Sequence, residues 1–360
     1  MTSFQQRKTS QIPHHYEPYT IMPPQQVFRL TGRNSYHELQ GFQEDIPTIS
    51  NREVLIRVRA VALNYRDFAV STGTYPFPIK DNVRSLRSAA PVVKKLVKGD
   101  TVIGTFDPTN LYGQQKDWYN GQGANVDGVL RQYIVLPAEA VVKVPTPSPL
   151  SHAQWASLVC TGVTAWNSLY GNVPLRPGQT VLFQGTGGVS ITGLILAKPA
   201  GATTIITSSS DEKLKYVKEK YGVDHTINYK KTPNWAEEAL RITDGNGVDQ
   251  IFENGGAGTI KQSLDAITMG GLISVIGLLA SIPQSEMPDV AALALAKGAV
   301  VRGITVGSTQ MLEDVVRFVG ARRLDVPVEK TFGFTREEIV KAYEYLQSGQ
   351  HIGKICINVE

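Results

Sequence analysis

The sequence predicts an α/β protein with a mostly β first half and a second half that forms a doubly wound parallel sheet. The first half contains the alternating, β-branched run EVLIRVRAVAL at residues 53–63, which is typical of strands. Between residues 180 and 277, short apolar strands alternate with helical stretches, as in a parallel sheet covered by helices. A chain of 360 residues, 42% of them hydrophobic, is long enough for two such domains.

The second half is organised around one βαβ unit. An apolar strand over Thr180–Phe183 runs into the glycine-rich turn GTGG, which opens an apolar helix and leads to a strand over Thr203–Thr207. Gly185 permits the tight turn, and Gly187 lets the backbone approach a pyrophosphate at the helix N-terminus. The small residue Ser190 replaces the usual third glycine. The pattern predicts a dinucleotide site that includes Gly185, Thr186, Gly187, Gly188 and Val189.

The alternation continues to the end of the chain. Helices are expected from Asp211, over Asn234–Ile242, Ile260–Ile267, Met311–Val319 and Thr335–Leu346, and strands over His225–Asn228, Val248–Glu253, Leu272–Gly277 and Gly353–Val359. The closing strand must pair somewhere, and the β-rich first half offers an edge. We therefore expect a discontinuous catalytic domain (residues 25–161 and 304–360), a dinucleotide-binding domain (162–303) and a flexible tail (1–24).

The composition favours a small-molecule partner. The formal net charge is +4 with dispersed Lys and Arg, so we expect neither a nucleic-acid partner nor a membrane surface. Two cysteines, Cys160 and Cys356, exclude a disulfide framework and fit a reducing compartment, so we expect a cytoplasmic protein. The polar N-terminus lacks the apolar core of a secretory signal, and Arg7 and Lys8 leave a mitochondrial presequence as the alternative to a flexible tail.

Five short motifs carry a resemblance to a known family. They are NYRD at residue 64, GDTVIG at 99, TGVTAW at 161, GTGGVS at 185 and GKI at 353. Together they resemble the medium-chain dehydrogenase/reductase superfamily, and within it the zinc-independent, quinone-oxidoreductase-like and fungal zinc-type alcohol dehydrogenase-like branch. The resemblance implies a GroES-like β-barrel catalytic domain, a Rossmann dinucleotide-binding domain and a substrate cleft between them.

The resemblance raises the question of zinc. Zinc-dependent members hold a catalytic metal through Cys, His and Cys, and many hold a structural metal through four cysteines, which this chain cannot supply. Asn64 falls at the first catalytic ligand, and Cys160 falls at the last, where it is expected to be a small packed residue. We therefore expect no metal, and a reaction on an activated C=C, an enone or a quinone rather than on a plain alcohol.

The resemblance also assigns catalytic residues. Asn64 and Tyr65 are expected to orient the substrate or the nicotinamide, with Tyr65 a candidate proton donor. Asp67 is either catalytic or simply paired with Arg66.

The predicted cofactor is NADPH rather than NADH. At the end of the second strand, where NAD enzymes place an acid, this chain has Ser208 and Ser209, with Lys213 one turn further on to neutralise a 2′-phosphate. The alternative is that Asp211 binds the ribose of NAD. Related NADPH reductases carry a similar serine and lysine and a tyrosine matching Tyr229. The remaining cofactor residues expected from the resemblance are Thr164, Gly255, Ile276, Gly277 and Lys354.

One segment departs from the family pattern. Residues 85–100, SLRSAAPVVKKLVKGD, are shorter than the corresponding segment of relatives and lack its glycines and acids. Either this part of the barrel adopts another register or the variant is impaired. The leading hypothesis is an NADPH-dependent reductase of an enone or quinone. The alternatives are a zinc-independent alcohol or aldehyde oxidoreductase and a cofactor-binding protein with impaired catalysis.

A homodimer is also considered. The apolar run AVVRGITVG at residues 299–307 is either an edge strand that pairs across a two-fold axis or an internal strand.

Overall fold

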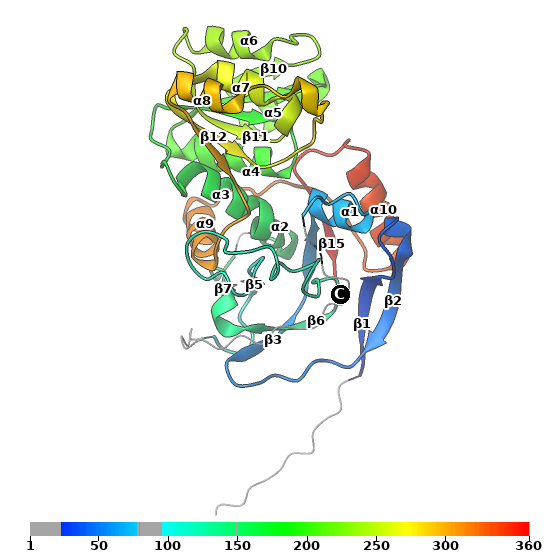
Figure 1. The fold of residues 1–360 in the computed structure, drawn as a ribbon. Coiled ribbons are helices and arrows are strands. Elements are labelled where there is room, and N and C mark those ends of the chain that lie inside the picture. Colours follow the sequence, from blue (N-terminus) through cyan, green and yellow to red (C-terminus); the bar gives the residue numbers. More distant parts are fainter. Residues whose placement is uncertain (1–22, 78, 80–95, 149, 360) are drawn as a thin grey trace, which may run out of the picture.

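The computed structural model describes residues 23–77, 79, 96–148 and 150–359. Figure 1 shows two parts, a helix-covered parallel sheet above a group of small sheets that includes both the N-terminal strands and the C-terminal strand. Most of the predicted tail (1–24) and most of the divergent segment (85–100) lie outside the described residues. The described residues contain no helix long and apolar enough to span a membrane.

The upper part is a six-stranded, wholly parallel sheet. Its strand order is β10-β9-β8-β11-β12-β13, which is the doubly wound order of a Rossmann fold with the switch point between β8 and β11. The strands are β8 (Thr180–Gln184), β9 (Thr203–Ser208), β10 (His225–Asn228), β11 (Val248–Glu253), β12 (Ile267–Val275) and β13 (Val300–Gly303). The predicted α/β fold class is confirmed.

Helices cover both faces of this sheet because side chains alternate along each strand. On β8, Leu182 packs in a cluster with α6 and α7, whereas Phe183 packs in another cluster with α4 and α5. These helices are α4 (Gly188–Ala197), α5 (Asp211–Tyr221), α6 (Trp235–Ile242), α7 (Ile260–Ala266) and α8 (Val290–Lys297). β13 pairs with β12 and forms one edge of the sheet.

The lower part consists of short paired strands. The pairs are β1 (Gln25–Leu30) with β2 (Leu39–Glu44), β3 (Glu53–Arg57) with β6 (Tyr133–Pro137), and β5 (Val102–Gly104) with β7 (Val141–Lys143). β15 (Lys354–Asn358) lies between β14 (Val328–Phe332) and β4 (Ala60–Leu63), and it runs antiparallel to β4. The closing strand therefore pairs with the first half of the chain, as expected.

Several helices connect or cover the two parts. They are α1 (Tyr65–Ser71), α2 (His152–Ser157), α3 (Val163–Tyr170), α9 (Thr309–Arg322) and α10 (Arg336–Gln347). The helical stretch after Ser151 is interrupted between α2 and α3 by a π-helical turn, Leu158–Gly162, that contains Cys160. Short 3-10 turns occupy Tyr36–Glu38, Ala138–Ala140, Lys198–Ala200, Gly256–Gly258 and Gln284–Glu286.

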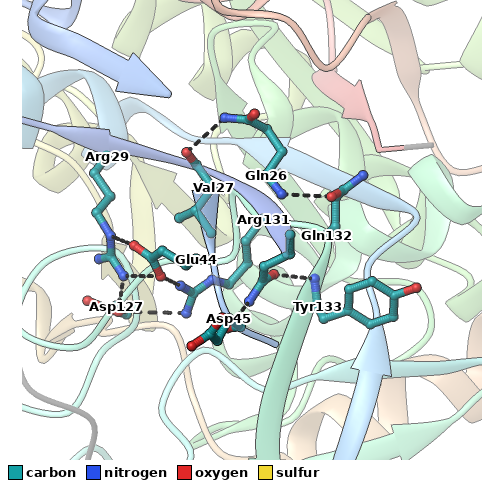
Figure 2. Close-up of polar contacts among 10 residues, drawn as sticks. Gln26, Val27, Arg29, Glu44, Asp45, Asp127, Arg131, Gln132 and Tyr133 are labelled. Carbon is teal, nitrogen blue, oxygen red and sulfur yellow. Dashed lines mark hydrogen bonds and ion pairs between the residues drawn. The ribbon is translucent and has the colours of Figure 1, made fainter. Parts of the chain in front are cut away.

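A cluster of charges fastens the β1–β2 hairpin to the chain that leads into β6 (Figure 2). The Glu44 carboxylate contacts Arg29 at 2.6 Å and Arg131 at 2.7 Å, and Asp127 contacts Arg29 at 2.8 Å. The Arg29 guanidinium holds the pKa of Glu44 below its usual range. Because two cations meet two carboxylates, the cluster is electrically balanced, and its role in the fold is to hold the hairpin.

Candidate active site

The glycine-rich turn follows β8 and presents an open surface to solvent. Gly185 adopts φ +74°, a left-handed conformation that favours glycine. A Cβ atom added to Gly185 or Gly187 would meet no atom within 4 Å, so the backbone here is bare. Gly187 is the N-cap of α4 and provides no side-chain cap, which leaves the first N–H groups of the helix for a ligand. The turn therefore fits the pyrophosphate of a dinucleotide.

Close packing of the same helix depends on a glycine that sequence analysis missed. A Cβ atom on Gly193 would lie 2.6 Å from the Phe183 ring and 2.8 Å from the Phe252 ring. Ser190, at the position of the usual third glycine, instead donates to the carbonyl of Gln184 at 2.7 Å. The close contact between helix and sheet therefore lies at Gly193, about one turn after Ser190. The glycine within the apolar helix was the sequence signal that could have predicted this contact.

A buried carboxylate shapes the neighbouring loop, and sequence analysis also missed it. Glu253 ends β11, is fully buried, and accepts hydrogen bonds from the backbone N–H groups of Gly255 (2.9 Å) and Gly256 (2.8 Å). It further accepts from the Gln184 amide at 2.7 Å and from the hydroxyls of Thr259 and Ser263. With all these donors satisfied, Glu253 positions the loop rather than acting on a substrate.

The other predicted residues at strand ends lie at this same sheet edge. The N–H groups of Ile276 and Gly277 donate to the carbonyl of Glu253 at 2.8 and 3.3 Å, which brings the end of β12 beside the loop after β11. A Cβ atom on Gly277 would meet the carbonyl oxygen of Asn254 at 2.6 Å. Gly255, Ile276 and Gly277 therefore lie with the glycine-rich turn at the carboxyl edge of the sheet, where such folds bind ligands.

The predicted ribose end contains serine hydroxyls and a lysine. Ser208 is buried at the end of β9, Ser209 is exposed, and the Tyr229 N–H donates to the Ser208 carbonyl at 3.1 Å, which brings Tyr229 alongside. The Lys213 ammonium donates to the carbonyl of Gly349 at 2.6 Å, in the segment before β15. Burial lowers the pKa of Lys213. Ser208, Ser209 and Tyr229 thus lie together, whereas the Lys213 ammonium is held at the segment before β15.

The competing ribose ligand, Asp211, is already engaged. Its carboxylate accepts from the Asn228 amide at 2.6 Å and forms an ion pair with Lys231. Both contacts lower the pKa of the Asp211 carboxyl group, and the contact with Lys231 has the larger effect.

The predicted catalytic residues follow β4. Asp67 accepts from the backbone N–H of Asn64 at 2.8 Å, and burial raises the pKa of Asp67. The Asn64 side chain accepts from the Lys354 ammonium at 2.7 Å and donates to the carbonyl of Ala62 at 3.2 Å. Lys354 is 3% exposed, and it contacts the partly buried Asn64, which in turn contacts Asp67.

The charge of Arg66 acts on Asp67, where it opposes the rise in pKa that burial causes. The Arg66 guanidinium donates to the carbonyl of Gln122 at 2.8 Å and lies over the rings of Tyr75 and Phe106. Tyr65 is 57% exposed, with its ring near Phe68. Asn64, Asp67 and Cys160 line a single cavity that also reaches Arg66 and Phe106.

The residues present do not fit zinc. Cys160 lies on the π-helical turn, where burial raises its thiol pKa, and Thr164 one turn later is buried beside it. The described residues contain no group of three or more His, Cys, Asp or Glu side chains that could hold a metal ion. The amide of Asn64 at the first ligand position is occupied by Lys354 and Ala62. This donor set lacks the thiolates and imidazoles that zinc prefers.

Comparisons with known proteins match both parts of the chain. The alcohol dehydrogenase GroES-like domain family matches residues 50–146, and the zinc-binding dehydrogenase family matches residues 188–321. The zinc-type alcohol dehydrogenase-like protein C1773.06c of Schizosaccharomyces pombe is 38% identical over 346 residues, which are 90% of this chain and 98% of that protein.

Solved structures are similar over almost the whole chain. A putative alcohol dehydrogenase from Sinorhizobium meliloti is 33% identical with a TM-score of 0.80, covering 94% of this chain and 100% of the other. An NAD-dependent alcohol dehydrogenase is 25% identical with a TM-score of 0.80, covering 93% of this chain and 100% of the other. These likenesses and the site geometry make this chain an oxidoreductase that belongs to the medium-chain dehydrogenase/reductase superfamily.

Proposed function

We propose that this protein is an NADPH-dependent reductase that transfers a hydride to an activated C=C bond or a quinone without zinc. The observation that carries the proposal is the group Asn64, Asp67 and Lys354, in which an amide, a carboxyl group and an ammonium lie together and Asn64 stands where the resemblance expects the first zinc ligand. Such groups can hydrogen-bond a conjugated carbonyl but do not polarise it as a Lewis acid does. An alkene or quinone that is already activated by conjugation suits this site.

The NADPH preference rests on the ribose end. Ser208 at the end of β9 carries no charge to repel a 2′-phosphate, and Lys213 in the first turn of α5 would supply a cation if its ammonium exchanged the Gly349 carbonyl for the phosphate. Asp211, the residue that an NAD enzyme would need, is held by Asn228 and Lys231. One similar structure is an NAD-dependent alcohol dehydrogenase, so NADH is the comparison that a cofactor experiment must include.

In the proposed mechanism the bound cofactor supplies the hydride. The N–H groups at the start of α4 would hold the pyrophosphate of a bound cofactor, and Thr164, Gly255, Ile276 and Gly277 would contact its nicotinamide. Asn64 and Asp67 would meet the acceptor in a fixed orientation, because each is hydrogen-bonded within the β4–α1 turn. This rigidity orients the acceptor for hydride transfer.

An acceptor screen tests the proposal. Purified protein is mixed with NADPH or NADH and with a 1,4-quinone, an enone, an aldehyde or an alcohol with NADP⁺, and nicotinamide absorbance is followed. We expect turnover with NADPH and the quinone or the enone. Turnover confined to alcohols and aldehydes would instead support the alcohol oxidoreductase suggested by the names of the relatives. Tight NADPH binding without any turnover would support an impaired protein.

We also propose that the protein is a homodimer and that it is cytoplasmic. We further propose that residues 25–161 and 304–360 form the catalytic domain and residues 162–303 the dinucleotide-binding domain. The exposed edge of β13 supports the dimer because its backbone groups on that side are free to pair with a second copy. Both cysteines are free thiols, which agrees with a reducing compartment. Size-exclusion chromatography with light scattering tests the dimer, for which the expected mass is twice 39.3 kDa.

A further inference from the structure

Arg66 lies in the first turn of α1, and its guanidinium is among the groups that line the cavity, together with Asn64 and Asp67. Its Nη1 donates to the carbonyl of Gln122 at 2.8 Å, and this is its single hydrogen bond within the described residues. Its Nε is buried and has no acceptor there. Because a guanidinium carries five N–H donors, Arg66 keeps unused donors at the cavity wall, which points to a ligand rather than to a structural role alone.

Two aromatic rings hold this guanidinium in place. The central carbon of the guanidinium lies 5.0 Å from the centroid of the Phe106 ring and 5.3 Å from that of the Tyr75 ring. Such rings attract a cation without using its N–H donors. Together with the Gln122 carbonyl they limit how the planar group can turn. A guanidinium held in this way is suited to bind the two oxygens of a carboxylate.

The neighbouring carboxyl group of Asp67 is not the direct partner of this cation. Asp67 accepts from the backbone N–H of Asn64 at 2.8 Å, and no ion pair joins it to Arg66 in the part of the chain that the structure describes. Burial raises the pKa of Asp67, and the charge of Arg66 opposes that rise from a distance. Arg66 is therefore free to take an anion as its contact partner.

The charges where the cavity reaches the surface also favour an anion. Arg57, Arg59 and Lys98 line the cavity and are exposed, and their side chains have no partner among the described residues. The carboxylates that line the cavity outside α1 already have hydrogen-bond or ion-pair partners; they are Glu53, Asp100 and Asp127. The unpaired charges at the opening are therefore positive, and such a field draws an anionic substrate toward the cavity.

We propose that Arg66 binds a carboxylate of the acceptor, so that the substrate is an enone acid rather than a neutral enone or quinone. The inference rests on the reductase function proposed above and names the substrate class of that site. The exposed cations attract the anion, and the Arg66 guanidinium binds its two oxygens. Because Asn64 and Asp67 line the same cavity, the conjugated part of the bound acid reaches them.

A matched pair of acceptors tests this assignment. 3-Benzoylacrylate and its methyl ester share the enone and the phenyl ring and differ in charge. Turnover of each with NADPH is measured for the wild type, Arg66→Met, Arg66→Lys and the control Arg336→Met. Arg336 is matched because its guanidinium also donates to backbone carbonyls, those of Leu39 and His37, but does not line the cavity. Calorimetry measures binding of the saturated acid 3-benzoylpropionate to the protein loaded with NADP⁺, because this readout needs no turnover.

We expect the wild type to favour the acid over the ester at least about tenfold in kcat/KM. Added salt should lower kcat/KM for the acid but not for the ester, because it screens the exposed cations. In Arg66→Met the acid-to-ester ratio should fall to about one, and 3-benzoylpropionate should bind at least about tenfold more weakly. Arg66→Lys should keep part of the preference, because an ammonium retains the charge without the planar fork. Arg336→Met should keep all of it.

Three results would overturn the carboxylate site. They are a wild type that uses the ester as well as the acid, an equal loss of both acceptors in Arg66→Met, and weaker NADPH binding in that variant with an unchanged acid-to-ester ratio. The second would leave Arg66 a structural role at Gln122, and the third would make it a cofactor ligand. If Arg66→Met does not fold, Arg66→Lys and the salt dependence decide.

Failure of the proposed function has a different signature. A protein that reduces neither acceptor but binds 3-benzoylpropionate through Arg66 would refute the reductase and support the carboxylate site. A protein that reduces the ester and a quinone without any preference for the acid would support the reductase and refute the site. Neither turnover nor binding would refute both.

Discussion

Two glycines of α4 give the sharpest test of the dinucleotide site, because one faces open space and the other faces the core. In Gly187→Ala the new methyl group meets no protein atom, and the observed φ of −76° and ψ of 179° suit alanine. The folding cost should stay below about 1 kcal/mol. The methyl group, however, occupies the approach of the pyrophosphate, so we expect NADPH affinity to fall at least about tenfold, or ~1.4 kcal/mol.

Gly193→Val is the matched variant on the packed side. Its Cβ atom would lie 2.6 Å from Phe183 and 2.8 Å from Phe252, both fully buried or nearly so. Such overpacking costs about 3 kcal/mol, which corresponds to a Tm lower by about 6–12 °C for a domain of this size. Thermal unfolding by circular dichroism and NADPH fluorescence titration below the transition separate the effects. Equal Tm losses in both variants, or unchanged NADPH affinity in Gly187→Ala, would refute the reasoning.

Three further outcomes are expected. Ser208→Asp should lower kcat/KM for NADPH at least about tenfold relative to NADH, because a carboxylate repels the 2′-phosphate. Lys213→Met should raise the dissociation constant of NADPH more than that of NADH; equal changes would place the lysine elsewhere. Arg29 lowers the pKa of Glu44 below its usual value of 4.5. The contacts of the ionised Glu44 therefore stabilise the folded protein fully above pH 4.5, and this stabilisation is lost as the pH falls through the lowered pKa. Glu44→Gln should cost about 2 kcal/mol at pH 7 and flatten this acid dependence in urea unfolding.

Local patterns were sufficient to predict most of the parallel sheet. The strands His225–Asn228 and Val248–Glu253 have the predicted bounds, because turn residues such as Asn246 and Gly247 separate apolar runs that must be buried. In contrast, β2 was not predicted. Its sequence LQGFQE is mostly exposed and polar, and its strand conformation comes from pairing with β1, which a local pattern does not encode.

The candidate site was predicted in outline but not in its contacts. The glycine-rich turn, Ser208 and Asn64 were found because each belongs to a short motif of the chain. The contact between Lys354 and Asn64 joins residues 290 positions apart, and the tether from Lys213 to Gly349 joins residues 136 apart. The sequence placed Lys354 near the cleft, and the pairing of β15 with β4 brings its ammonium to Asn64.

That pairing also explains how two parts of the chain keep a fixed geometry around a reaction centre. Gly353 adopts φ +79° and donates its N–H to the carbonyl of Thr186 at 3.0 Å, so the chain touches the glycine-rich turn immediately before β15 begins. The next residue, Lys354, contacts Asn64, and Ile355 pairs with Leu63 of β4. Two consecutive residues, Gly353 just before β15 and Lys354 at its start, thus contact the glycine-rich turn and Asn64. Because a strand is stiff along its length, the spacing between the pyrophosphate site and Asn64 is set by covalent geometry and one backbone register rather than by packing between separate domains.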